Sequence, residues 1–173
     1  MAESHTIMRY LADSRNCDAH WYPRDLQKRA LVDMYLDQHH TYLRSGVGGF
    51  IFKSIFSPKM FGKSYGAKEI EFHKIMLKRS LRLIENRLTE TRYLCGDEKT
   101  IADLSAACEL DQTRYIDLSL DAYPKTKAWL HNMIDESPEV LEFHKQHRKF
   151  AAMSIANEKK KAAAATAKAA PKL

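Results

Sequence analysis

Apolar residues recur every three or four positions along most of the chain, which is the spacing of a helix with one buried face. The longest such stretch runs from about Ala67 to Thr91, and shorter ones run from about Ser4 to Ala12 and from Pro23 towards Leu43. No segment alternates apolar and polar residues for long enough to form a convincing strand. The pattern therefore predicts an all-α fold. The predicted buried face of the longest helix comprises Ile70, His73, Leu77, Leu81, Ile84 and Leu88.

The second helix is expected to open at Pro23, because proline fits the first helical position and Asp25 in the first turn complements the helix dipole. A glycine-rich stretch should loosen or bend this element before the apolar segment Phe50 to Phe56. The glycines are Gly46, Gly48 and Gly49, and the predicted buried stripe ahead of them is Leu26, Ala30, Met34 and Tyr35.

Three later helix starts can be located from their first residues. Thr100 and Asp103 have the spacing of a capping box, in which a hydroxyl caps the helix and an acid three residues on binds the N–H of the cap. We expect this helix to carry Cys108 inward. Pro124 opens a short helix, and Ser137-Pro138-Glu139 has the order of hydroxyl, proline and acid that is typical of another start.

The composition is that of a chain with one core. At 173 residues and 45% hydrophobic content, a second core is not expected. No apolar run approaches the roughly 18 residues needed to span a membrane.

The N-terminus lacks the basic-then-apolar order of a secretion signal, so we expect a reducing compartment. Cys17, Cys95 and Cys108 are odd in number and widely spaced, so neither a disulfide framework nor a zinc site is expected.

The net charge of +6 belongs mostly to residues 158–173. That segment carries five lysines and one glutamate, which leaves +2 for residues 1–157. It contains no aromatic side chain to stack on a base, and its alanines favour helix. Such a tail attracts phosphate or an acidic surface weakly. We therefore expect a solvated basic extension and no nucleic-acid partner.

Histidines gather at two places. His144-x-x-His147 beside Glu142 puts two imidazoles on one helical face, and His39-His40 adds two more. A metal site would need a third ligand and a pocket that excludes water. We predict surface or half-buried histidines and no metal site. No nucleophile–base arrangement and no glycine-rich phosphate loop is recognisable.

The pair Glu3-Ser4 stands at the start of the first predicted helix and allows two interpretations. The serine can act as a simple N-cap. Alternatively, the exposed N–H groups and the positive end of the helix dipole can seat a carboxylate, with the hydroxyl as an additional donor.

Several segments occur together in an order that points to one family. They are Glu3–Leu11, His20–Leu26, His39–Thr41 with Leu43-Arg44, Tyr93–Asp97, Thr100–Leu104, Cys108–Leu110 and Trp129. Together they resemble glutathione transferases of the theta class, plant-type members especially. The first segment is similar to the last helix of the glutathione-binding domain, and the rest is similar to the C-terminal helical domain. The resemblance covers nearly everything from Glu3 to about Phe150.

The resemblance implies a division of the chain into three parts. Residues 1–14 would be the remnant last helix of a glutathione-binding domain. Residues 15–157 would form a helical bundle of the glutathione transferase C-terminal domain type, and residues 158–173 a basic Lys/Ala-rich tail. The thioredoxin-like domain, with the serine that activates the thiol in theta enzymes, would lie before Met1. On this interpretation the chain alone has no catalytic residue.

The resemblance also implies a set of site residues. Glu3 and Ser4 match the pair that holds the γ-glutamyl end of glutathione. Arg44 matches an arginine that faces the thiol end of the site. Thr100 and Asp103 match a structural capping box, in which the buried acid serves folding and takes no part in catalysis.

Three classes of function follow, and the first is favoured. In the first, the chain is a non-catalytic interaction or structural subunit of a larger assembly, because it lacks the activating group and exposes an apolar face. In the second, it is part of an active theta-class glutathione transferase that conjugates glutathione to small electrophiles. In the third, the basic tail makes it a nucleic-acid accessory protein.

The ligand, partner and location are expected as follows. No resident cofactor is expected, and glutathione would be a ligand or co-substrate. The partner would be a protein: a second copy, a thioredoxin-like chain or a larger complex. The default location is cytoplasmic. Pro171-Lys172-Leu173 differs only at its first position from the Ser-Lys-Leu peroxisomal address, so a peroxisome is the alternative, as is an organellar assembly.

Overall fold

The computed structural model describes residues 1–169, and these residues confirm the predicted all-α fold. No strand forms within them, although an isolated bridge joins Tyr93 to Gly96. The α-helices are α1 (Ser4–Ser14), α2 (Leu26–His39), α3 (Leu43–Ile51), α4 (Ser57–Phe61), α5 (Ala67–Glu90), α6 (Ile101–Leu110), α7 (Pro124–Ile134) and α8 (Pro138–Ala169). A π-helical turn, η1 (Phe52–Phe56), joins α3 to α4, and a 3₁₀ segment, η2 (Asp111–Ile116), continues α6.

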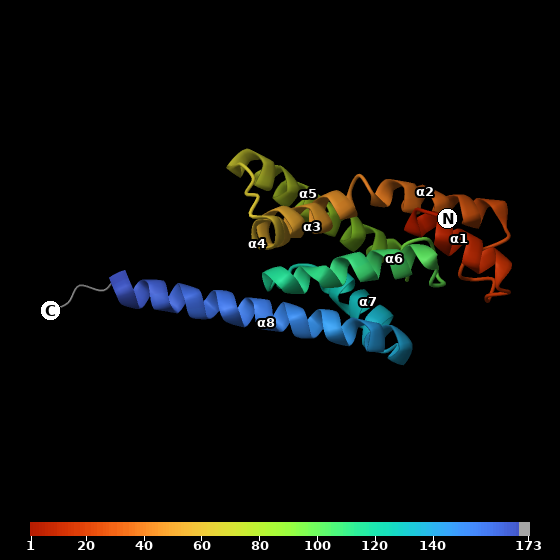
Figure 1. The fold of residues 1–173 in the computed structure, drawn as a ribbon. Coiled ribbons are helices and arrows are strands. Elements are labelled where there is room, and N and C mark those ends of the chain that lie inside the picture. Colours follow the sequence, from red (N-terminus) through yellow and green to blue (C-terminus); the bar gives the residue numbers. More distant parts are fainter. Residues whose placement is uncertain (170–173) are drawn as a thin grey trace.

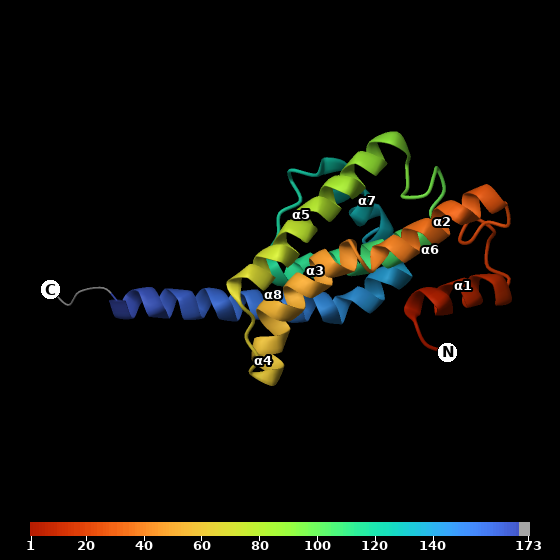
Figure 2. The same ribbon diagram turned by 90° about the horizontal axis from the view of Figure 1, so that it is seen from above.

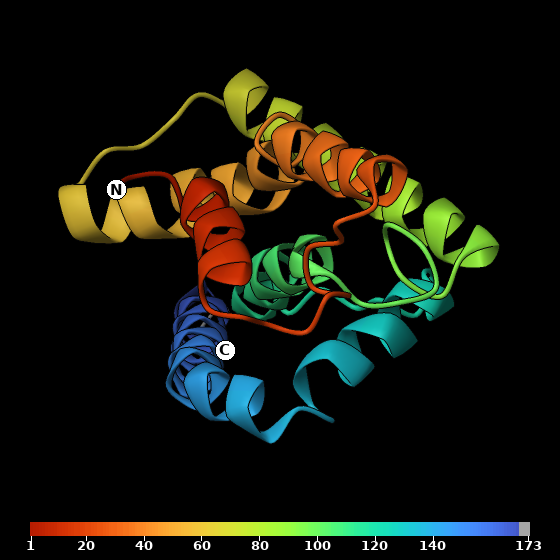
Figure 3. The ribbon, with the colours of Figure 1, turned by 90° about the vertical axis from the view of Figure 1, so that its right-hand side faces the viewer.

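Helix α6 lies at the centre of the bundle. The layer of α2, α3 and α5 covers one side of it, and α7 and α8 cover the other (Figure 1). The view along the bundle shows the other helices arranged around it, with α1 beside it (Figure 3). Its alanines allow this close packing, because a small side chain lets neighbouring helices approach. The α6 residues with no exposed surface include Ala102, Ala106, Ala107 and Leu110.

Helix α8 begins beside α7 and runs on past the rest of the molecule (Figure 2). The expected boundary at residue 157 falls inside it, and the basic segment continues the helix to Ala169, as its alanine content favours. None of the helices in residues 1–169 combines the length and apolar character needed to cross a membrane. The sequence Pro171-Lys172-Leu173 lies outside the described residues.

Helix α2 begins later than predicted. Asp25 is its N-cap, and the carboxylate accepts a hydrogen bond of 2.9 Å from the N–H of Lys28. Pro23 precedes the helix, where its carbonyl oxygen accepts a hydrogen bond from Arg29. Capping by the acid therefore outweighs the preference of proline for the first helical position.

The buried face of α2 also differs from the predicted stripe. Val32, Leu36 and His39 are buried, whereas Leu26 is 80% exposed and Met34 is 50% exposed. The predicted stripe is rotated from the true one because several apolar residues lie on both sides of this helix, so spacing alone does not select a face.

The glycines of α3 permit close packing, and the π-helical turn η1 follows them in the segment that was expected to loosen. A Cβ atom on Gly46 would lie 2.7 Å from the backbone of Leu77 in α5, and one on Gly48 would lie 2.6 Å from Oε1 of Glu109 in α6. The chain also breaks ahead of the glycines, between α2 and α3, at residues 40–42. Without a side chain at these glycines, α3 can lie directly against both neighbours.

Candidate functional site

The N-terminal end of α6 is organised around Asp103, whose side chain is completely buried. The N–H groups of Thr100 and Leu94 each donate to this carboxylate at 2.9 Å, and the indole N–H of Trp129 donates at 3.1 Å. The hydroxyl of Thr100 accepts a hydrogen bond from the N–H of Ala102, so both arms of the capping box are present. Burial raises the pKa of Asp103, and these hydrogen bonds offset part of the rise.

The N-terminus of α1 places Glu3 and Ser4 at the surface. Glu3 is the N-cap, with a φ of 65°, and neither its side chain nor another makes a capping hydrogen bond there. A positive φ is strained for a residue other than glycine, so the local chain is held in an unusual conformation. Ser4 is the first helical residue and is exposed, which differs from a simple serine N-cap.

The next residue, His5, ties this end of α1 to α6. Its Nε2 lies 2.8 Å from the hydroxyl oxygen of Ser105, and its ring meets the rings of His39 and His40 with centroids 4.9 and 4.5 Å away. Burial, together with the two neighbouring imidazoles, lowers the pKa of His5 to about 4. His5 is therefore neutral near pH 7, and it serves as a hydrogen-bonded contact between the helices.

Arg44 lies at the start of α3 and pairs with Glu109 of α6. Its guanidinium nitrogen is 3.0 Å from a carboxylate oxygen of Glu109, which is 3% exposed, whereas about half of the arginine side chain is in solvent. His39 approaches the same oxygen at 3.7 Å. The buried carboxylate therefore fixes the position of a partly exposed cation. Sequence reasoning missed Glu109, although an acid among the apolar positions of α6 is a signal for it.

The N-terminus of α1 and Arg44 are both attached to the same face of α6. Ser105 and Glu109 are four residues apart, so their side chains lie one above the other on the helix surface. Through His5, Ser105 anchors the end of α1 that carries Glu3 and Ser4. Through its ion pair, Glu109 anchors Arg44. A helix N-terminus and a cation, both suited to an anionic ligand, are thus attached to a single scaffold.

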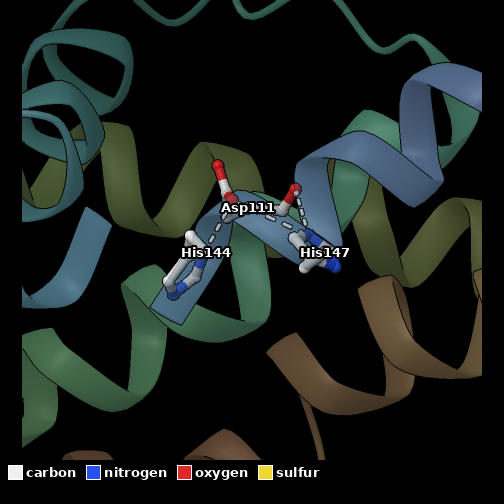
Figure 4. Close-up of side chains that lie close together, drawn as sticks. All are labelled: Asp111, His144 and His147. Atoms are coloured by element: carbon white, nitrogen blue, oxygen red, sulfur yellow. Dashed lines mark hydrogen bonds and ion pairs between the residues drawn. The ribbon is translucent and has the colours of Figure 1, made fainter. Parts of the chain in front are cut away.

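A second cluster surrounds Asp111, where α6 passes into η2. Asp111 is completely buried, and His144 and His147 point toward it from α8 (Figure 4). Nδ1 of His144 lies 2.8 Å from a carboxylate oxygen, Arg148 donates two hydrogen bonds at 3.0 and 3.1 Å, and Arg114 donates one at 2.7 Å. Sequence reasoning placed Glu142 beside the histidines. That carboxylate instead pairs with Lys145, and Asp111 is the acid that joins them.

The charges of the Asp111 cluster favour an ion-pair network over a cation site. One atom each of Asp111, His144 and His147 lies within 4.8 Å of the others, a spacing suited to a metal ion. However, two guanidinium groups already occupy the carboxylate. Burial alone would raise the pKa of Asp111, but the hydrogen bonds from His144, Arg148 and Arg114 hold it well below its usual range. A metal ion would have to displace these cations.

Comparison with known protein families gives a match over much of the chain. The model for the C-terminal domain of glutathione S-transferases matches residues 49–136. Glutathione S-transferase T1 of Arabidopsis thaliana is 34% identical over 155 residues, which cover 80% of this chain and 63% of that protein. The chain therefore spans less than two thirds of the length of this relative.

Solved structures agree with this match. The human glutathione S-transferase T1-1 W234R mutant superimposes with a TM-score of 0.77 at 28% identity, over 89% of this chain and 65% of that one. A human theta-class transferase in complex with the glutathione conjugate of 1-menaphthyl sulfate gives a TM-score of 0.79 at 25% identity, over 91% and 66%.

These relatives overturn one expectation. The favoured hypothesis of a non-catalytic interaction or structural subunit is wrong, because proteins that match about 80% of this chain carry the names of glutathione transferases and not of scaffolds. The second hypothesis, part of an active theta-class transferase, agrees better with them. The family match, the theta-type relatives and the shared fold lead to one conclusion: the chain belongs to the glutathione S-transferase family and is related to its theta class.

Proposed function

We propose that this chain supplies the helical part of a theta-class glutathione transferase, which joins glutathione to small electrophiles. In such a reaction the glutathione thiolate attacks the electrophilic carbon and displaces a leaving group. The observation that carries the proposal is the attachment of the open N-terminus of α1 and of Arg44 to the same face of α6. Glutathione would be a substrate here and not a resident cofactor.

The N-terminus of α1 would bind the γ-glutamyl end of glutathione. The first-turn N–H groups have no capping side chain, and the positive end of the helix dipole favours an anion there. The carboxylate of Glu3 would accept a hydrogen bond from the α-amino group of glutathione. The hydroxyl of Ser4 would donate one to the α-carboxylate. The left-handed backbone at Glu3 would present both side chains beside the helix end.

Arg44 would act at the other end of the site, near the thiol. The buried carboxylate of Glu109 holds the guanidinium by one ion pair, which leaves further N–H donors of Arg44 for a ligand. There it would stabilise negative charge on the thiolate or on the leaving group. The group that activates the thiol would come from a thioredoxin-like domain, in the same polypeptide or in another. We retain the division at residues 14/15 and 157/158 as part of this proposal.

A second copy of the chain is the partner that we propose. A groove of about 230 Å³ between α2 and α5 has Leu31, Met34 and Leu83 among its lining residues, all three of them exposed. Covering these side chains would remove apolar surface from water. The cytoplasmic location stays a prediction.

The proposal is tested by turnover. The protein purified from its native source would be assayed with glutathione and a small alkyl halide or epoxide. Variants Arg44→Ala and Arg82→Ala, expressed in the same source, would be assayed beside it. Losing a group that stabilises developing charge should lower kcat by about 10²-fold in Arg44→Ala. Arg82 is exposed on α5, so its variant should match the wild type. Turnover no faster than the uncatalysed reaction, or equal loss in both variants, would reject the proposed function.

A further inference from the structure

Helix α8 carries apolar side chains on its outer side as well as on the side that packs on the bundle. His144 and Ala151 face the bundle and are buried. Phe143, Phe150 and Met153 face solvent, with 86%, 65% and 53% of their surface exposed. We call these three residues the exposed stripe of α8. Such large apolar side chains gain free energy when a partner removes them from water.

The exposed stripe follows the axis of the helix. Phe143 and Phe150 are seven residues apart, so they lie on the same side of α8, about 10 Å from one another along the axis. Met153 is three residues beyond Phe150, and Lys160, which is also exposed, is seven residues beyond Met153. Side chains on the outside of a single helix form a convex ridge. Such a ridge fits a flat surface better than it fits a pocket.

The part of α8 that carries the stripe is strongly basic. Residues 143–169 contain six lysines and one arginine against one glutamate. That glutamate is Glu158, and its carboxylate lies 3.1 Å from Nζ of Lys59 in α4. Lys149 and Lys160 are exposed beside the stripe. An anionic partner is therefore attracted along the length of this part of the helix.

The position of α8 leaves the stripe within reach of a large surface. The helix begins beside α7 and runs on past the rest of the molecule to Ala169 (Figure 2). Its acids Glu139 and Glu142 stand at the α7 end, and the lysines follow toward Ala169. The groove for the proposed second copy lies between α2 and α5, across α6 from α8 (Figure 1). A dimer formed there would leave the stripe uncovered.

We propose that α8 is the docking surface for an anionic lipid bilayer. Phe143, Phe150 and Met153 would enter the headgroup region, and the lysines around them would lie beside acidic lipids. Helices that rest on a bilayer combine apolar side chains with lysines in this way, and they enter the interface without crossing it. Each lysine near the surface adds to the attraction.

The stripe favours lipid over the other flat polyanion, a single-stranded nucleic acid. Bases bind through stacking on aromatic rings, whereas Met153 adds apolar area and offers no ring. Docking on lipid requires no transferase activity, so it can fail or succeed independently of the proposed function.

The first test compares two kinds of vesicle. The protein purified from its native source would be sedimented with vesicles of phosphatidylserine and phosphatidylcholine, and with vesicles of phosphatidylcholine alone. We expect binding about tenfold tighter to the acidic vesicles, weakened by added salt. Equal binding to both vesicles would overturn the proposal. So would no binding to either, which is the result expected if a thioredoxin-like domain covers the stripe.

Substitutions of the two phenylalanines separate the stripe from general charge. The double variant Phe143→Ser, Phe150→Ser should bind acidic vesicles about tenfold more weakly or worse, because two apolar side chains are lost. Phe143→Leu, Phe150→Leu keeps apolar side chains and should retain most of the binding. Phe72→Ser is the matched control, since Phe72 is 54% exposed on α5 across the bundle, and it should bind like the wild type.

Circular dichroism would verify that all variants fold, and if the serine variant does not, the vesicle comparison with the wild type still decides. Wild-type binding by the folded serine variant would mean that charge alone attracts the vesicles, and it would overturn the proposal. Tighter binding to single-stranded DNA than to acidic vesicles, lost in the leucine variant, would also overturn it, because the rings would then serve for stacking on bases.

Discussion

Asp103 and Asp111 lie at opposite ends of helix α6, and both are completely buried. Neutral donors hold Asp103: two backbone N–H groups, a hydroxyl and an indole. Cations hold Asp111: two arginines and a protonated histidine. Burial raises the pKa of Asp103, whereas the cations lower that of Asp111. Equal burial therefore gives opposite electrostatic results, because the partners decide whether the charged form is favoured.

The largest loss of stability is expected when the carboxylate of Asp111 is removed. Asp111→Ala would leave the partly buried cations of His144 and Arg148 without their carboxylate, and removing one partner of a buried ion pair typically costs about 3–5 kcal/mol. Denaturant unfolding would measure the loss. A cost below that of Asp103→Ala would show that water, or the remaining pair between Arg148 and Asp135, compensates the cations.

Removing the carboxylate of Asp103 should cost less stability. Asp103→Ala would leave the N–H groups of Leu94, Thr100 and Trp129 without their acceptor, which we expect to cost about 2–3 kcal/mol. Asp97→Ala, in the exposed turn before α6, is the matched control and should have little effect. Equal small effects for the two variants in the same unfolding experiment would contradict the role given to Asp103.

The charged end should also make stability depend on pH. The pKa of His144 is raised from 6.5 to about 9, so its contribution is fully present below pH 6.5 and is lost as the pH rises through 9. We expect a loss of about 2 kcal/mol over this window. Unfolding measured at several pH values should show this slope in the wild type and not in His144→Gln. An identical slope in the wild type and in His144→Gln would mean that another titrating group causes the pH dependence.

The smallest effect is expected at an exposed ion pair of the far part of α8. Lys159 lies 2.8 Å from Asp117, with both side chains largely in solvent. Such pairs contribute little, so Lys159→Ala should change stability by about 0.5 kcal/mol or less. A larger loss would mean that the basic end of α8 supports the bundle, which would weaken the contrast between buried and exposed charges.

The same contrast explains what the sequence could reveal. Thr100 and Asp103 are three residues apart, so local spacing is enough to locate the capping box. Arg114 is three residues from Asp111, but its other two partners, His144 and Arg148, are 33 and 37 residues away on another helix. Nothing in the spacing predicts that α8 will cross at this point. Cys108, which is exposed, was assigned to the wrong face for a related reason, since α6 is surrounded by neighbours and its apolar pattern is nearly continuous.

The residues of the candidate glutathione site also differ in how far the sequence predicts them. Arg44 could be named from the family resemblance, but Glu109, which holds it, depends on how closely α3 packs against α6 at Gly48. The contact of His5 with Ser105 likewise depends on the packing of α1 on α6. Side chains that act through distant partners are therefore visible in the structure and hidden in the sequence.

The central claim, that this chain carries part of a glutathione site, is tested most directly by NMR. Glutathione would be added to the isotope-labelled protein, and the backbone amide shifts would be followed to millimolar ligand, where binding of only about 4 kcal/mol is detected. We predict concentration-dependent shifts in the first turn of α1, from Ser4 to Ile7, and around Arg44. These shifts should weaken in Arg44→Ala. Saturating shifts confined to other helices, or no shifts in α1, would contradict the account.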